Sequence, residues 1–183
     1  MKSLSTQIKI GLLAIILSSS ANAGFITGYG GTITATGGDV TVEVLHSSSG
    51  YYNRINFFPS FPDESNAVFV GIDNYLRSLA LGTFSAGTEL VFGITNHHDT
   101  YFMGDGSRNS DGIIHAFVKN LGPSGNYVER VLVGFEDLPG GGDNDFNDVF
   151  IRVSQTAAVP APETLGIMLL GLSALVLRRS RKI

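Results

Sequence analysis

The chain has 183 residues, of which 43% are hydrophobic and 10% aromatic, so one domain with a substantial core can form. There are 23 glycines and no cysteine, which excludes disulfides as the source of stability. Six basic and fifteen acidic residues lie between Gly24 and Ala158, giving this part a net charge of −9. That balance disfavours nucleic-acid binding, which needs a basic surface, and favours cation binding.

The first 23 residues contain the parts of a secretory signal peptide in the usual order. Two lysines supply positive charge, the apolar run Ile10–Leu17 predicts the signal helix, and Ala21–Ala23 (Ala-Asn-Ala) fits an A-x-A cleavage site. We therefore expect cleavage between Ala23 and Gly24 and export of the mature protein.

Residues 24–156 predict one domain, an antiparallel β-sandwich of the jelly-roll type. Val40, Val42 and Val44 alternate with polar residues, as in a half-buried strand. Strands are also predicted over 55–58, 67–72, 75–83, 89–95, 113–118, 127–135 and 149–153, with an irregular or edge segment at 25–38 and a polar loop at 96–110. Within 75–83 the spacing of Tyr75, Leu76 and Leu79 also fits a helix, but Gly82 and Gly87 favour the strand. Seven or eight short strands with regular turns are typical of a sandwich or jelly roll.

The stretch 134–153, GFEDLPGGGDNDFNDVFIRV, predicts two strands joined by an acidic, glycine-rich loop. Its acids are Glu136, Asp137, Asp143, Asp145 and Asp148. Carboxylates this close repel one another unless a cation neutralises them, and Ca²⁺ prefers oxygen ligands. The spacing fits neither an EF-hand nor tandem GGxGxD repeats nor a P-loop. We predict a calcium site with a structural role. The alternative is a solvated turn.

A second loop could hold another cation or complete the first site, although an exposed turn is an equal alternative. Its oxygen-bearing residues are Asp105, Asn109 and Asp111. The adjacent His97 and His98 do not predict zinc, because neighbouring side chains on a strand point opposite ways and no HExxH pattern is present. His115 lies in an apolar segment and is predicted to be a hydrogen-bonded core residue.

The sequence predicts no enzyme. Two carboxylates could serve a glycosidase, but these acids cluster in one loop rather than across a cleft. There is no G-x-S-x-G elbow and no cysteine nucleophile. Some aromatic residues could form a sugar-stacking platform, although the core is the favoured place for most of them: Tyr29, Tyr51, Tyr52, Phe57, Phe58 and Phe61.

Residues 157–183 predict a linker, a short apolar helix and a basic end. The apolar run Leu165–Leu177 has 13 residues, fewer than the roughly 17–25 of a full membrane span. The basic end should stay cytoplasmic. We predict transient membrane contact through this tail, with a permanent anchor as the alternative.

The tail resembles a PEP-CTERM sorting signal. The matching residues are Pro160, Pro162, Glu163, Arg178 and Arg179, although the chain reads Pro-Ala-Pro-Glu where the motif reads Pro-Glu-Pro. The resemblance implies recognition by an exosortase in a Gram-negative bacterium, and a place in the cell envelope, on the cell surface or in the extracellular polysaccharide matrix.

Gly134–Asp137 and Asp143–Asp148 resemble the signature GFED…D-x-D-[FY]-N-D of a bacterial family of unknown function that is common in extracytoplasmic proteins. Similar segments lie upstream, at 87–93, 109–112 and His115. The resemblance spans roughly Val40 to Val153. It implies a β-sandwich-like domain and no settled activity.

Together these features predict an exported, non-enzymatic surface or matrix protein with a structural calcium site. A calcium-dependent carbohydrate-binding module is the alternative, and an envelope glycan hydrolase is the weakest reading.

Overall fold

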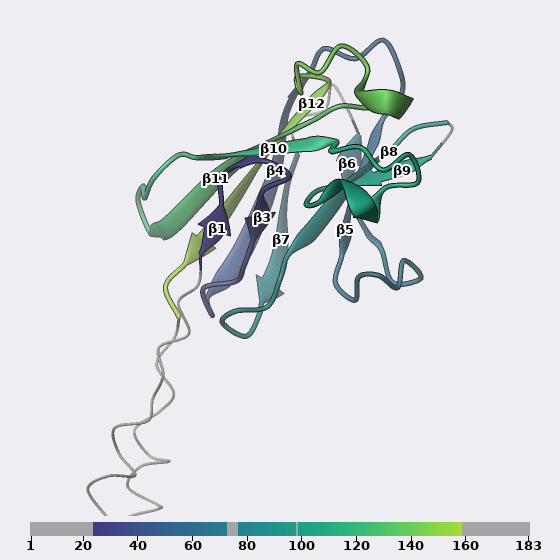
Figure 1. Cartoon of the computed structure of the whole chain (residues 1–183). Coiled ribbons are helices and arrows are strands. Elements are labelled where there is room, and N and C mark those ends of the chain that lie inside the picture. The colour runs from purple at the N-terminus through teal and green to yellow at the C-terminus, as the bar shows by residue number, and fades with distance from the viewer. Residues whose placement is uncertain (1–23, 73–76, 98, 159–183) are drawn as a thin grey trace, which may run out of the picture.

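In a computed structural model, residues 24–72, 77–97 and 99–158 are described, and they form a sandwich of β-strands (Figure 1). The elements are β1 (Phe25–Ile26), β2 (Gly28–Tyr29), β3 (Thr32–Ile33), β4 (Asp39–Ser47), β5 (Arg54–Phe58), β6 (Val68–Ile72), β7 (Arg77–Thr83), β8 (Val91–Thr95), β9 (Thr100–Phe102), η1 (Gly106–Arg108), β10 (Ala116–Asn120), β11 (Tyr127–Phe135), η2 (Pro139–Gly141) and β12 (Val149–Thr156).

Two sheets make up the sandwich. The larger has the order β2-β10-β11-β12-β4-β7, the smaller has the order β6-β5-β8-β9, and β1 pairs with β3. The strand pairs of both sheets are antiparallel. The predicted all-β antiparallel sandwich is therefore confirmed. The two predicted terminal helices lie outside the described residues.

The core lies between the two sheets and follows from period-two alternation. In β11, Val131, Val133 and Phe135 are buried, and Leu132 between them is only partly buried. Gly134 is buried as well. The smaller sheet contributes its own buried residues, among them Phe92 and Ile94 of β8. Fully burying one such side chain contributes about 1.5–3 kcal/mol relative to leaving it exposed.

The predicted polar loop at 96–110 is wrong in its middle, because it contains β9. Tyr101, Phe102 and Met103 are buried, and β9 pairs with β8. The strand predicted over 113–118 begins later than expected, because β10 starts at Ala116.

The side chain of Asn109 holds the loop between β9 and β10 in place. It accepts a hydrogen bond from the Phe102 amide and donates to the Phe102 and Ile113 carbonyls, which holds 103–113 against the end of β9.

The acidic loop, residues 136–148, joins β11 to β12 at one end of the sandwich. In Figure 1 it lies at the top, whereas β1 and the far end of β12 lie lower, on the left side of the sandwich. Within the described ranges there is no helix with the length and apolarity that a membrane crossing requires.

Candidate metal centre in the acidic loop

The acidic loop is closed by the strands on either side of it. Phe135 and Val149 are partners in the ladder between β11 and β12, so Glu136 and Asp148 are the next pair beyond it. The Asp148 amide also donates to the Phe135 carbonyl at 3.1 Å. The glycines between the two acidic clusters, Gly140 to Gly142, all have positive φ, which lets the chain turn back on itself.

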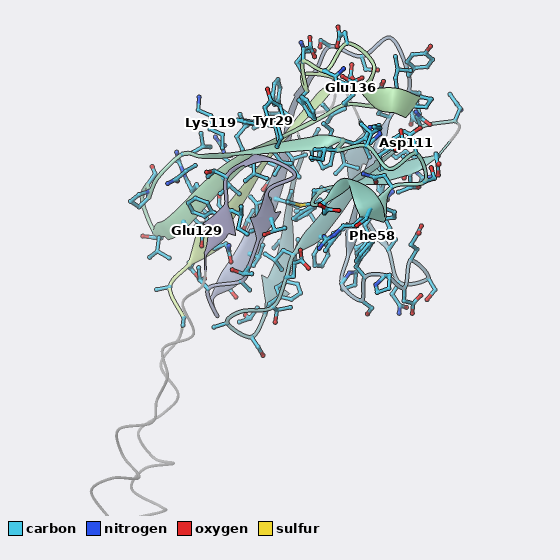
Figure 2. The ribbon with its side chains drawn as sticks, in the orientation of Figure 1. Tyr29, Phe58, Asp111, Lys119, Glu129 and Glu136 are labelled. Carbon is cyan, nitrogen blue, oxygen red and sulfur yellow. The ribbon has the colours of Figure 1, made fainter. Side chains whose placement is uncertain are left out.

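All five predicted acids come together here. Their carboxylate oxygens form two groups in which the atoms lie within 4.8 Å of one another, Glu136–Asp143–Asp145 and Glu136–Asp137–Asp148. Glu136 belongs to both groups. Figure 2 shows Glu136 at the end of the molecule that carries the loop, far from Glu129.

Glu136 is the centre of this arrangement. Its side chain is only 1% exposed, and its Oε2 has no hydrogen-bond partner. Burial raises the pKa of Glu136 to about 8, with further contributions from the negative charges of Asp148 and Asp143. Burying a charged carboxylate with one oxygen unpaired is costly, so this position favours the protonated form or a nearby cation.

Asp137 and Asp148 are oriented by hydrogen bonds. Asp137, also 1% exposed, accepts at Oδ2 from the Asn53 amide at 2.6 Å and from the Ser49 hydroxyl. Its backbone amide donates to Asp148 Oδ2 at 2.9 Å. Burial raises the pKa of Asp148, and the charges of Asp137 and Asp145 add to this, although the Asp137 amide opposes it. The inner acids are therefore held in place rather than merely close.

Asp143 and Asp145 form the outer side of the cluster and are exposed. Asp145 is fixed by Asn147, whose backbone amide donates to its Oδ1 at 3.0 Å and whose side-chain amide donates to its Oδ2. This side of the cluster is therefore open to solvent. The shared Glu136 suits either one ion or two ions bridged by its carboxylate.

In the second predicted metal loop, the side chains of Asp105, Asn109 and Asp111 accept hydrogen bonds from backbone amides. Asp105 accepts from the Ser107 amide at the start of η1, and Asn109 is occupied by the backbone bonds described above. Asp111 Oδ2 accepts from the Gly140 amide at 2.8 Å, so it ties this loop to the acidic loop. Among the described residues, no group of potential metal ligands includes Asp105 or Asp111.

His115 is a buried, hydrogen-bonded core residue, as predicted. It is 0% exposed, its Nδ1 lies 2.9 Å from the Glu136 carbonyl, and its Nε2 lies 2.9 Å from Asp111 Oδ2. Its ring stacks on Tyr101 with the centroids 3.8 Å apart. His97 is exposed, while His98 and the predicted sorting motif lie outside the described residues.

Comparison with protein families gives one match, to the family described as Domain of unknown function (DUF4114). The match covers residues 82–156. This part holds β8 to β12 and the whole acidic loop, so all five acids lie within the matched region, while Ser49 and Asn53 lie outside it. The match supports the predicted resemblance to a family of unknown function. The finer signature and the PEP-CTERM signal stay predictions.

No curated protein sequence matches the chain. Among solved structures, a similar one is the Chromobacterium violaceum lectin CV2L in complex with alpha-methyl-fucoside, at 19% identity and a TM-score of 0.41. The alignment covers 77% of this chain and 99% of the lectin chain. At this identity and TM-score, the similarity does not bear on what this chain binds.

A hollow of about 440 Å³ lies between the acidic loop and Tyr29 of β2. It is lined by Tyr29, Gly112, Ile113, Ile114, Asn144 and Phe146.

The aromatic residues that the sequence places in the core are only partly found there. The prediction holds for Phe57 and Phe58, which are buried. It fails for the tyrosines, because Tyr29, Tyr51 and Tyr52 are 66%, 45% and 55% exposed.

Proposed function

We propose that this protein is an exported, non-enzymatic surface or matrix protein whose β-sandwich binds Ca²⁺ through the acidic loop. One observation carries the proposal: the buried Glu136 carboxylate has an oxygen without a partner and belongs to two groups of carboxylates. A cation at this position would satisfy that oxygen and would remove the repulsion among the acids.

The donor set favours calcium over other metals. Every candidate ligand is a carboxylate oxygen, which suits a hard cation, whereas zinc sites use histidine and cysteine. Ca²⁺ accepts six to eight oxygens in flexible geometry, while Mg²⁺ demands a near-ideal octahedron and keeps its waters. Glu136, Asp137 and Asp148 would supply the inner ligands, and Asp143 and Asp145 the outer ones.

The role we assign to the ion is structural. It would link the end of β11, the start of β12 and the glycine-rich turn between them, and so hold the loop in one shape. A hydrolytic role is less well supported, because the acids crowd on one loop rather than facing one another across a cleft.

Export and sorting rest on the sequence of the two ends. The signal peptide supports cleavage before Gly24, and the tail supports handling by an exosortase with transient membrane contact. The extracellular polysaccharide matrix is the environment that this combination favours.

The calcium proposal is tested by melting the mature chain in chelator, Mg²⁺ and Ca²⁺. At a hundredfold excess over the dissociation constant, Ca²⁺ should stabilise the fold by about 2.7 kcal/mol, and Mg²⁺ should do less. Asp145→Asn should weaken the calcium response, and Glu64→Gln, which removes one charge from an exposed residue outside the loop, should not. A wild-type transition that millimolar Ca²⁺ leaves unmoved would refute the site.

A calcium-dependent carbohydrate-binding module is the second candidate. The observation that favours it is the hollow beside the acidic loop, where the ring of Tyr29 is exposed.

A further inference from the structure

Three segments of the chain build the walls of the hollow. Tyr29 comes from β2, residues Gly112 to Ile114 precede β10, and Asn144 and Phe146 belong to the acidic loop. Its volume of about 440 Å³ lies within the roughly 300–1,000 Å³ that small-molecule sites usually have. Because one wall is part of the acidic loop, the shape of the hollow depends on the shape of that loop.

Tyr29 presents an open aromatic face that is held in place from behind. Its ring is 66% exposed, yet it contacts Phe117 with centroids 5.2 Å apart and Phe146 with centroids 5.0 Å apart. The backbone is also fixed, since Tyr29 pairs with Phe117 in the ladder between β2 and β10. A rigid aromatic side chain gives contact area at a low entropic cost, and its hydroxyl adds a polar contact.

Phe146 makes the buried part of the hollow. Its side chain is 7% exposed and its φ is +56°, a left-handed conformation that is rare for an aromatic residue. Gly134 permits the close approach of this residue to β11, because a Cβ at Gly134 would overlap the Phe146 carbonyl oxygen. Together with Ile113 and Ile114, Phe146 gives the hollow an apolar lining.

The polar groups of the hollow are neutral. Asn144 is exposed and offers an amide that both donates and accepts hydrogen bonds. None of the six lining residues is charged, and the net charge of −9 between Gly24 and Ala158 disfavours an anionic ligand. A ligand with one apolar face and several hydroxyl groups fits these walls, and a pyranose ring has this chemistry.

The hollow is connected to the metal cluster through Asn144. Asp143 and Asp145 flank Asn144 in the chain, and both belong to the Glu136 group of carboxylates. Behind them, Gly141 lies so close to the Asn144 amide and to Ile113 that a Cβ at that position would crowd both. An ion that fixes the two aspartates would therefore fix Asn144 in the wall of the hollow.

We propose that this hollow binds a neutral pyranose sugar, with Tyr29 as the stacking face and Asn144 as a hydrogen-bonding partner, and that calcium in the acidic loop strengthens the binding. The calcium dependence rests on the proposed function. The sugar site itself rests on the hollow alone.

The test is binding of the full mature chain to an array of neutral oligosaccharides, with Ca²⁺ and with chelator. We expect binding that falls at least tenfold in Tyr29→Ala and persists in Tyr29→Trp, which keeps a stacking face. Tyr52→Ala is the matched control, because Tyr52 is 55% exposed and does not line the hollow. Chelator should weaken binding by the wild type. Melting curves confirm that each variant is folded.

The outcomes separate the two proposals. If the wild type binds no neutral glycan, or if Tyr29→Ala binds as well as the wild type, the sugar site is refuted. A peptide array is probed in parallel, and binding to peptides alone would also refute the sugar site. If binding depends on Tyr29 but neither binding nor melting responds to Ca²⁺, the sugar site stands and the calcium function fails. If Ca²⁺ raises the melting temperature but leaves Tyr29-dependent binding unchanged, the coupling between the sites is refuted.

Discussion

Gly142 packs directly against the carboxylate of Glu136: a Cβ at Gly142 would overlap Glu136 Oε1. The third glycine of the triplet therefore does more than permit a turn. It leaves the space that the buried carboxylate occupies. Gly140 has positive φ as well, at +74°, but a Cβ there would meet nothing within 4 Å.

This contrast makes the two glycines a matched pair for mutation. Gly140→Ala should cost only the strain of a left-handed alanine, about 1–2 kcal/mol, and should keep calcium binding. Gly142→Ala should cost more and should weaken calcium affinity at least tenfold, since the Glu136 side chain must move. Denaturant melts and calcium titrations of both variants provide the measurement. Equal calcium affinity in both would show that Glu136 does not ligate the ion.

The raised pKa of Glu136 predicts how stability depends on pH. The group titrates near its usual value of 4.5 when unfolded and at about 8 when folded, so between these values the folded state holds more protons. Without calcium, the free energy of unfolding should therefore fall as the pH rises from about 4.5 to about 8. Saturating Ca²⁺ should remove this fall, because the ion replaces the proton.

Glu136→Gln is the control for the pH prediction. The amide keeps the shape of the side chain but cannot titrate, so both the fall in stability and the strong calcium response should be lost. Chemical denaturation at several pH values, with chelator or Ca²⁺, measures both. A wild-type curve that stays flat in chelator would contradict the assignment to Glu136.

Asp111 is predicted to act on the metal cluster without being a ligand. It accepts from the Gly140 amide and faces His115, whose other ring nitrogen faces the Glu136 carbonyl. Asp111→Ala should destabilise the protein by about 1–3 kcal/mol and should weaken calcium binding severalfold. Asp105→Ala, which removes a carboxylate that contacts Ser107 and interacts with the charge of Arg108, should leave calcium affinity unchanged. The measurement is calcium titration of both variants.

The ends of the chain give a further prediction. The Gly24 amide donates to Thr34 Oγ1 at 2.8 Å, and the Gly24 carbonyl accepts from the same hydroxyl, so a mature chain that begins at Gly24 would start inside the fold. Intact-mass measurement should find Gly24 as the first residue.

Deleting Pro160–Ile183 should leave a folded domain with a nearly unchanged melting temperature. A truncated chain that aggregates would show that the tail packs on the domain.

The sequence predicts strands well where alternation is long and uninterrupted. β11 lies at the predicted residues 127–135, and β5 and β8 lie close to theirs, because their apolar residues recur over several positions. β9 was missed because only three residues pair, and they are embedded in a polar segment. Short strands of this kind depend on partners far along the chain, which local patterns do not reveal.

In the candidate site too, local features can be predicted from the sequence and contacts with distant residues cannot. The five acids could be found from sequence because they fall within one loop. Ser49 and Asn53, which orient Asp137, are 88 and 84 residues away from it and have no local signal. The exposure of Tyr29 could not be predicted either, because an aromatic residue in a β-rich chain usually enters the core.

The position of β12 has a mechanical consequence. It runs from the acidic loop to the last residues of the domain, and it is paired with β11 on one side and β4 on the other. The seven steps from Val149 to Thr156 span about 23 Å. If the loop end holds a ligand while the tail is held by the cell envelope, tension between them acts along this strand. The hydrogen bonds of both ladders would then be loaded together in shear, instead of opening one after another.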